Sequence, residues 1–238
     1  MQKSLFALAT AAVIGLTAPQ AVLAAPHDEV YTQTFDVWHD LSGTNWRDSL
    51  SLAKFDSKLG FLQSITFSLA GQVQGTGKAE SLDADASEVT LILSSLLTLY
   101  RPDNSALVVA HPIFSETFAL SPFDGTIDFA GTSGASTGLR SNIGSNSFIS
   151  RSSSDFDLFS AYGGGFINLG LNAIGTSNAS GSGNLVTQFE TAAAGRLTVT
   201  YAYISAVPEP ETYVMMLTGL ALAGVVARRR KAAKADIA

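Results

Sequence analysis

The sequence predicts an all-β middle domain, a jelly-roll-like antiparallel β-sandwich, flanked by an apolar helix at each end of the chain. Three observations lead to this fold class. Apolar and polar side chains alternate with a period of two, and clusters of Gly, Asn, Asp and Ser separate the alternating runs. No segment between residues 30 and 205 shows a sustained 3.6-residue period with helix caps. About ten strands without crossover helices are expected to pair antiparallel and to pack as two sheets.

The first 24 residues predict a secretory signal peptide. Lys3 gives the start a positive charge, and residues 5–16 form an apolar run. A 12-residue helix spans only about 18 Å, too little for a bilayer core of about 30 Å. Small residues place the cleavage after Ala24, with Ala25 as the alternative. We therefore expect a signal helix that directs export by the Sec machinery and is removed by signal peptidase.

Four runs of alternating side chains carry the fold prediction for the middle domain, residues 25–205. In each run the apolar residues fall on one face, as in a half-buried strand. These residues are Ile65, Phe67, Leu69 and Val73; Val89, Leu91, Leu93, Leu97 and Leu99; Ile167, Leu169 and Leu171; and Leu197, Val199, Tyr201 and Tyr203.

Composition excludes several function classes. Between Ala25 and Val207 there are 8 Lys and Arg against 17 Asp and Glu, a net charge of −9. A domain of this charge lacks the basic surface that nucleic-acid binding requires. The chain of 238 residues contains no cysteine, which excludes disulfides, thiolate catalysis and cysteine-bound metals. We expect no cofactor.

The C-terminal segment predicts a membrane helix with a defined orientation. Residues 212–227 form an apolar stretch of about 24 Å as a helix, which is short for a full span unless the flanking side chains snorkel. The stretch is followed by a basic cluster, which predicts that the final residues, 232–238, stay cytoplasmic. The cluster consists of Arg228, Arg229, Arg230 and Lys231, and the residues before the apolar stretch are Pro208, Glu209 and Pro210. The two prolines favour an extended strip of chain that an enzyme can reach.

This order of proline, glutamate, proline, apolar helix and arginines over residues 206–231 resembles the PEP-CTERM sorting region of Gram-negative bacteria. The resemblance implies that exosortase, a membrane-embedded enzyme, processes the tail near Pro208, Glu209 and Pro210. It implies an exported protein, first anchored in the inner membrane and then placed in the cell envelope, on the surface or in the extracellular matrix. Proteins of this kind tend to occur in bacteria that make exopolysaccharide and biofilm.

Two stretches of the middle domain resemble the choice-of-anchor E domain found in such proteins. They are residues 55–65, with Phe-Asp and Leu-Gly before a strand, and residues 123–134, with an Asp-Gly-Thr-x-Asp run. The resemblance implies placement and fold, and the family offers no catalytic residues. From the residues themselves, Asp56 is expected to form an Asx turn and Gly60 to adopt a positive φ.

No residue set predicts catalysis, so we expect that the protein is not an enzyme. Residues 134–138 have the spelling G-x-S-x-G, but the three histidines, His27, His39 and His111, all precede the serine and no helix pattern follows it. A Gly/Ser loop is the preferred interpretation. Gly77-Lys78 lacks the other residues of a P-loop. The histidines form no ligand pair, and His39 and His111 are expected at the surface or in turns.

Two binding functions stay open beside a structural or adhesive role in the envelope or exopolysaccharide matrix. Asp56, Asp124 and Asp128 are weak calcium candidates, together with the pairs Asp83/Asp85 and Asp155/Asp157, because none has the spacing of a calcium loop. Trp38 and Trp46 flank a turn and are candidates for stacking on a sugar, as are Tyr162, Tyr201 and Tyr203, although tyrosines at a period of two more often pack in the core or across strands. The alternative function is therefore a carbohydrate-binding, lectin-like surface module, assisted by calcium or not.

Overall fold

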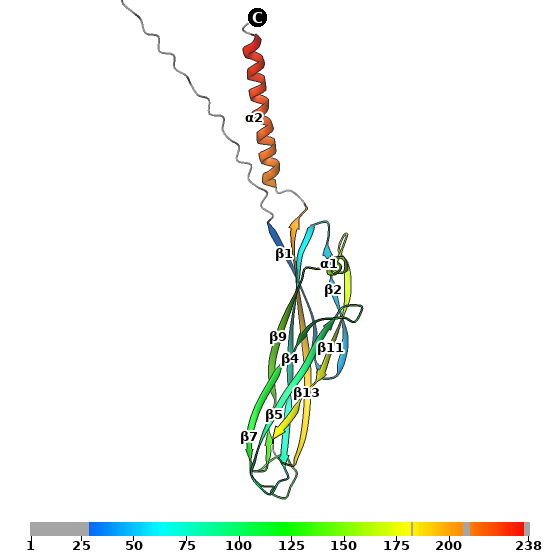
Figure 1. Cartoon of the computed structure of the whole chain (residues 1–238), viewed down its shortest axis with the longest axis vertical. Helices are drawn as coiled ribbons and strands as arrows, with labels where there is room; N and C mark the ends of the chain where they lie inside the picture. Colours follow the sequence, from blue (N-terminus) through cyan, green and yellow to red (C-terminus); the bar gives the residue numbers. More distant parts are fainter. Residues whose placement is uncertain (1–28, 182, 207–209, 236–238) are drawn as a thin grey trace, which may run out of the picture.

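The computed structural model describes residues 29–181, 183–206 and 210–235. These residues form two sheets packed face to face in an elongated sandwich, with a helix beyond one end (Figure 1). The prediction of a mainly antiparallel β-sandwich is confirmed. The predicted signal peptide, with its cleavage site at Ala24 or Ala25, lies outside the described residues.

The first sheet contains the two longest strands of the described chain. Its order is β1 (Val30–Gly43), β13 (Leu185–Ser205) and β4 (Gly60–Ser81), and then β9 (Arg140–Ser150) and β8 (Gly134–Ser136), which pair with successive parts of β4. A strand of 22 residues such as β4 is about 70 Å long. The two ends of β4 therefore mark the two ends of the molecule.

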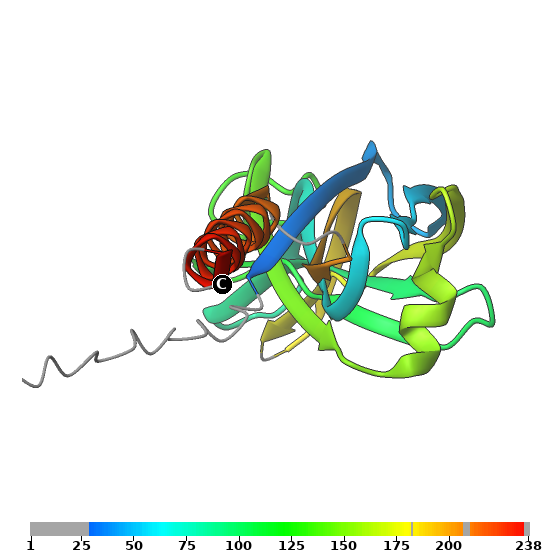
Figure 2. The same ribbon diagram turned by 90° about the horizontal axis from the view of Figure 1, so that it is seen from above.

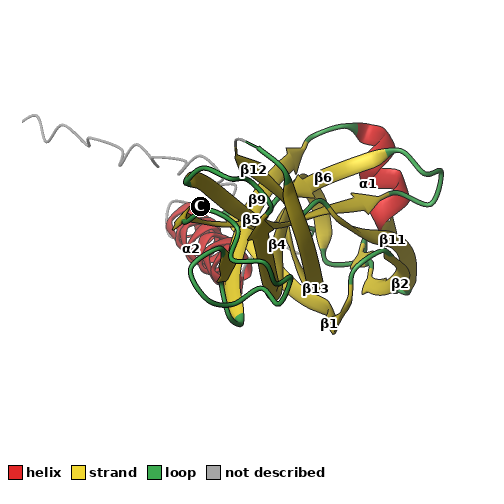
Figure 3. Ribbon diagram, turned by 90° about the horizontal axis from the view of Figure 1, so that it is seen from below, coloured by secondary structure: helices red, strands yellow, loops and turns green. Residues whose placement is uncertain are grey.

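The second sheet has β2 (Trp46–Ala53) at its edge, followed by β11 (Phe166–Gly175) and β5 (Ser87–Tyr100). Further along β5 the partner on the β11 side is β12 (Asn178–Gly181). On its other side β5 pairs with β6 (Ala106–Ala110) and then β7 (Ile113–Leu120). Figures 2 and 3, which look along the molecule from its two ends, show these two layers facing each other.

The path of the chain through the two sheets is that of a jelly roll. The strands β1, β4, β8/β9 and β13 lie in the first sheet, whereas β2, β5, β6/β7 and β11/β12 lie in the second. The chain therefore crosses between the sheets at almost every step, and its last strand, β13, lies between β1 and β4. This is the double-sheet arrangement that avoids long open edges in antiparallel folds.

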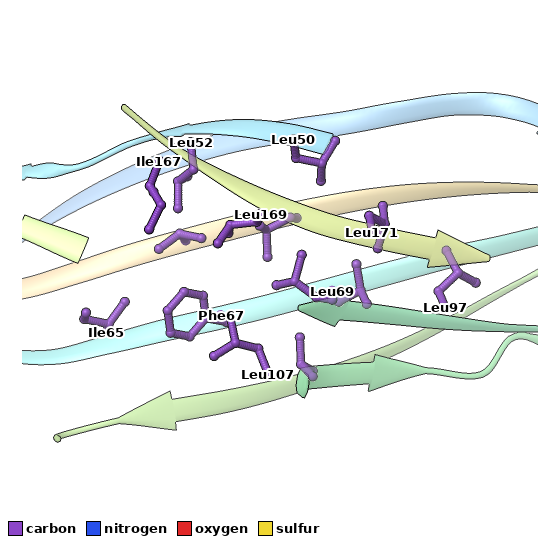
Figure 4. Close-up of a cluster of buried hydrophobic side chains, with 14 of the residues drawn as sticks. Leu50, Leu52, Ile65, Phe67, Leu69, Leu97, Leu107, Ile167, Leu169 and Leu171 are labelled. Atoms are coloured by element: carbon purple, nitrogen blue, oxygen red, sulfur yellow. The ribbon is translucent and has the colours of Figure 1, made fainter. Parts of the chain in front are cut away.

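The core lies between the sheets and contains the residues that the alternation predicts. Figure 4 shows side chains of both sheets meeting in this layer, including Phe67, Leu97 and Leu169. Of the predicted residues, all but Tyr203, which is partly buried, are buried. Tyr201 is fully buried, its hydroxyl donates to the Ala53 carbonyl at 2.9 Å, and burial raises its pKa.

Three local features correct the sequence-based prediction. A helix, α1 (Ser153–Phe159), lies within the region in which none was predicted. The expected Gly/Ser loop at residues 134–138 contains the strand β8, whereas Gly77 and Lys78, for which a P-loop was rejected, lie inside β4. The short strands β3 (Phe55–Asp56) and β10 (Ser160–Ala161) pair parallel, unlike the rest of the described strands. α1 has only seven residues, too few for a recognisable period.

Candidate sorting site at the tail end of the sandwich

The tail leaves the sandwich from a strand that is paired on both sides. Ile204 of β13 is opposite Val30 of β1 and Phe61 of β4, and the Ala206 N–H donates to the Leu59 carbonyl at 3.0 Å. Helix α2 (Pro210–Ala235) begins four residues later. The predicted recognition residues Pro208 and Glu209 lie outside the described residues, between these two elements.

The helical part of the C-terminal prediction is confirmed. α2 has 26 residues and includes the whole of the predicted stretch 212–227. Proline is favourable at its first position, where the missing N–H is not needed. The helix extends to Ala235, so residues 232–235 of the predicted tail are helical. Among the described residues, no helix has the length and apolar content that crossing a membrane requires.

The described side chains of α2, those of residues 214–226 and of Arg228, are exposed. Its apolar residues include Met215 with 73 % and Leu222 with 64 % of the side chain exposed. Arg228 lies about two helical turns before the last residue of α2, Ala235. The structure does not describe the side chains of Pro210, Arg229, Arg230 and Lys231.

The turn beside the tail is built around Asp56, as the sequence predicts. Its carboxylate accepts the N–H groups of Lys58 at 3.0 Å and Gly163 at 2.8 Å, and these bonds hold the pKa of Asp56 below its ordinary value. Gly60 has a φ of 157°, and a Cβ there would lie 1.9 Å from the Ile204 carbonyl oxygen. The glycine therefore lets β4 approach the last residues of β13.

The three calcium candidates are not brought together. Asp56 lies just before the first strand residue of β4. Asp124 and Asp128 lie in the loop of residues 121–134, which is bonded to Glu80 near the other end of β4 and is therefore at the opposite end of the molecule. The latter two accept N–H groups two residues on, from Thr126 and Ala130, each at 2.9 Å. Asp56 therefore does not lie beside Asp124 and Asp128. In the described part of the chain, no group of three or more His, Cys, Asp or Glu side chains could hold a metal.

The other two acidic pairs do not form a site either. Asp83 accepts the Asn184 N–H at 3.1 Å. Asp155 is 4 % exposed and makes a two-pronged ion pair with Arg101, with N–O distances of 2.8 and 3.0 Å. The Arg101 guanidinium holds the pKa of Asp155 below its ordinary value.

A buried carboxylate that the sequence did not indicate organises the far-end loop. Glu80 is fully buried; its Oε1 accepts the Ser133 hydroxyl at 2.6 Å and its Oε2 accepts the Phe129 N–H at 2.7 Å. Phe129 has a positive φ of 55°. In the alternation of β4, Glu80 falls on the outward face, and it is buried because the loop of residues 121–134 lies over it. The strand pattern alone gives no signal of this.

His39 is not the simple surface residue that was predicted. It points inward from β1 and lies between Ser42 and Asp48, with Nε2–Oγ at 2.9 Å and Nδ1–Oδ2 at 2.6 Å. The order Ser-His-Asp is that of hydrolytic triads. However, Trp46 stacks on the histidine ring with 3.8 Å between ring centroids, and the chain of bonds joins β1 to β2 across the sandwich edge. We interpret it as a link between the sheets.

His111 is exposed between β6 and β7, as predicted, and His27 lies outside the described residues. Trp38 and Trp46 do not form a common stacking surface. Trp38 is 62 % exposed on the outer face of β1, whereas Trp46 is partly buried, packs against the core and donates to the Ala193 carbonyl at 3.2 Å.

A shallow hollow lies on the outer face of the first sheet. It has a volume of about 260 Å³ and is lined by Gln74, Gly75, Thr76, Leu139, Glu190, Thr191 and Ala192. Glu190 is its single carboxylate. Glycosidases of the usual kind need two carboxylates that flank the bond to be broken.

The fold and its C-terminal extension define a jelly-roll domain that carries a separate helical tail. Comparison with family models matches residues 206–231 to the PEP-CTERM protein-sorting motif, which is the tail alone. The chain therefore carries the motif that exosortase recognises, and the motif indicates an exported protein sorted to the cell envelope. A search of curated proteins finds no match.

Solved structures with some similarity come from infectious bursal disease virus. The structure of the Gx strain is 14 % identical and covers 75 % of this chain and 37 % of its own, with a TM-score of 0.19. The structure of the T13 viral particle is 12 % identical; the match covers 85 % of this chain and 45 % of the viral chain, with a TM-score of 0.21. The chain thus spans less than half of either protein. At these scores we base no argument on the likeness.

Proposed function

We propose that the chain is made as a precursor with two addresses, and that its jelly roll is the part delivered to the envelope. The N-terminal 24 residues direct Sec export and are removed by signal peptidase. α2 then holds the exported protein in the inner membrane, with Arg228–Lys231 on the cytoplasmic side, until exosortase acts near Pro208, Glu209 and Pro210.

One observation supports this proposal most strongly. The described polypeptide is bonded into the sheet up to Ala206, and α2 begins at Pro210, so Pro208 and Glu209 of the motif fall in the short strip between two folded elements and Pro210 begins the helix. Processing in this strip requires no unfolding of β13. The exposed apolar side chains of α2 also favour contact with lipid or with a membrane enzyme, because soluble proteins seldom leave such a surface in water.

For the jelly roll itself we propose a non-catalytic, structural or adhesive role in the envelope or exopolysaccharide matrix, in line with its resemblance to choice-of-anchor E domains. The carboxylates of the calcium candidates bind backbone N–H groups or Arg101, and Trp46 covers the histidine of the Ser-His-Asp chain. The carbohydrate-binding alternative rested first on Trp38 and Trp46, with Tyr162, Tyr201 and Tyr203 as further stacking candidates, of which Tyr201 is fully buried. Since Trp46 is packed against the core, we propose the structural role instead.

The sorting proposal is tested by replacing Pro208, Glu209 and Pro210 with alanine in the native host. We expect the full-length form to accumulate in the membrane fraction, because exosortase no longer recognises the strip. Mass spectrometry of the mature C-terminus of the unchanged protein locates the processed bond. A Pro102→Ala variant, altered in an exposed loop, is the control and should be processed normally. Normal processing of the triple-alanine variant would refute the proposal.

A further inference from the structure

Exposed apolar side chains gather at the end of the sandwich from which the tail leaves. Phe61 is 70 %, Phe166 74 % and Tyr162 82 % exposed. Phe61 lies in one cross-strand row with Ile204 and with Val30, which is 54 % exposed. In the neighbouring rows of the same sheet the outward residues are instead small or polar, such as Thr32, Ala202 and Ser64.

The exposed apolar side chains at this end come from separate parts of the chain. The Lys58 ammonium lies 4.5 Å from the centre of the Tyr162 ring, and the Gly163 N–H bonds to Asp56, which fixes the turn carrying Tyr162 against the start of β4. Phe166 begins β11 opposite Ala53. We call Phe61, Tyr162 and Phe166, together with the adjacent aliphatic Val30, the aromatic rim. Figure 1 shows its strands, β1, β4 and β11, reaching toward the end at which α2 lies.

The length of the connecting strip places this rim close to whatever surrounds α2. Between Ala206, which is bonded to Leu59, and Pro210, the first residue of the helix, the chain spans at most about 14 Å. If α2 is held in a bilayer, the tail end of the sandwich therefore lies at the membrane–water interface. Exposed aromatic rings, with a lysine beside them, are the side chains that this interface favours.

We propose that the aromatic rim rests on the lipid interface while the precursor is anchored, and that it holds the jelly roll with its long axis away from the membrane. The occupant of the rim is thus the bilayer surface itself. This inference rests on the proposed anchoring by α2. Docking would keep the Pro-Glu-Pro strip at the depth at which a membrane-embedded enzyme works.

The absence of cysteine in the chain gives a direct test. Single cysteines replace Phe61, Tyr162 or Phe166 in the full-length chain and carry an environment-sensitive fluorophore. The chain is reconstituted into vesicles of phosphatidylcholine and phosphatidylglycerol, some with a quencher on the lipid. Ile127→Cys, at an exposed apolar position in the far-end loop, is the matched control, and Leu217→Cys reports on α2.

We expect a blue shift and quenching by lipid at positions 61, 162 and 166 and at 217, but not at 127. Quenching at 217 without any at the three rim positions would overturn the rim proposal and leave the anchoring intact. Loss of quenching at 217, with no flotation of the chain with vesicles, would overturn the anchoring. Equal quenching at position 127 would show unspecific adsorption of the whole protein to the vesicles. A blue shift that appears without vesicles and grows with protein concentration would show that the rim binds a second copy of the chain. Either result would overturn the proposal.

Discussion

At the scale of single residues, the pair Arg101–Asp155 is the most buried ion pair among the described side chains. Asp155 also accepts the Ser150 hydroxyl at 2.5 Å, and its N–H is capped by the Ser152 hydroxyl at the start of α1. One carboxylate thus joins the end of β5, the end of β9 and the helix. Because Asp155 is buried, its charge depends on Arg101 for compensation.

Asp155→Asn should lower the free energy of unfolding by about 3 kcal/mol at neutral pH, since it leaves the Arg101 charge without its partner. Urea unfolding followed by fluorescence measures the change. Asp157→Asn, an exposed carboxylate of the same helix, is the control and should change stability little. Equal losses in the two variants would contradict the role given to the pair.

The same pair predicts a pH dependence. The pKa of Asp155 is lower in the folded chain than its ordinary value, so its contribution to stability is complete above that ordinary value and is lost as the pH falls through the lowered folded pKa. The difference in stability between the unchanged protein and Asp155→Asn should therefore shrink on acidification below about pH 4. A difference that stays constant down to the acid limit would show that ionisation is not involved.

At the scale of elements, the far-end loop depends on a strand residue for its shape. The loop of residues 121–134 is bonded to Glu80 and, through the Ser121 N–H and the Thr132 carbonyl, closes on itself. Gly134 allows the close approach, because a Cβ there would lie 2.3 Å from the Ala130 nitrogen. The buried carboxylate of Glu80 therefore acts together with these backbone contacts to fix the loop.

Glu80→Ala should cost about 2 kcal/mol and should loosen the loop, because the Phe129 N–H and the Ser133 hydroxyl lose their acceptor. Hydrogen exchange is the most direct measurement, and we expect faster exchange of the Phe129 amide. The exposed Glu88 on β5 provides the control variant, Glu88→Ala. An unchanged exchange rate at Phe129 would show that Glu80 does not hold the loop.

The elements that sequence reasoning could predict are those with long alternating runs. Ile65 to Val73 and Leu197 to Tyr201 are inward-facing at every expected position, because a half-buried strand imposes a period of two. The Asx turn at Asp56 follows equally from local chemistry. α1 is different: its one available signal was Ser152, placed three residues before Asp155, a spacing typical of a helix N-cap.

The candidate site could be predicted only in part, because its residues meet through the fold. Pro208, Glu209 and Pro210 are consecutive, so the motif is recognisable without a structure. Phe61 is distant in sequence from Tyr162 and Phe166, and the three come together because β10 pairs with β3 and β11 pairs with β2. Likewise, a strand pattern cannot indicate that a distant loop covers Glu80.

At the scale of the whole molecule, the sandwich and the tail are expected to be separate units of stability. The described α2 side chains are exposed, and β13 is bonded up to Ala206. A chain that ends at Ala206 should therefore match the full-length chain in free energy of unfolding to within about 0.5 kcal/mol. A chain that ends at Thr200, which lacks the fully buried Tyr201, should fail to fold. A large loss of stability on removal of the tail alone would contradict this independence.

The position of β13 also determines how the domain responds to a pulling force. A load applied through the tail enters β13 along its own axis, while β1 and β4 hold it on either side with hydrogen bonds perpendicular to that axis. The many bonds of the two ladders then share the load at the same time instead of opening one after another. A cell in flowing water could thus be tethered through this strand without extraction of the strand from the sheet, and covalent attachment at the tail would be as strong as the jelly roll itself.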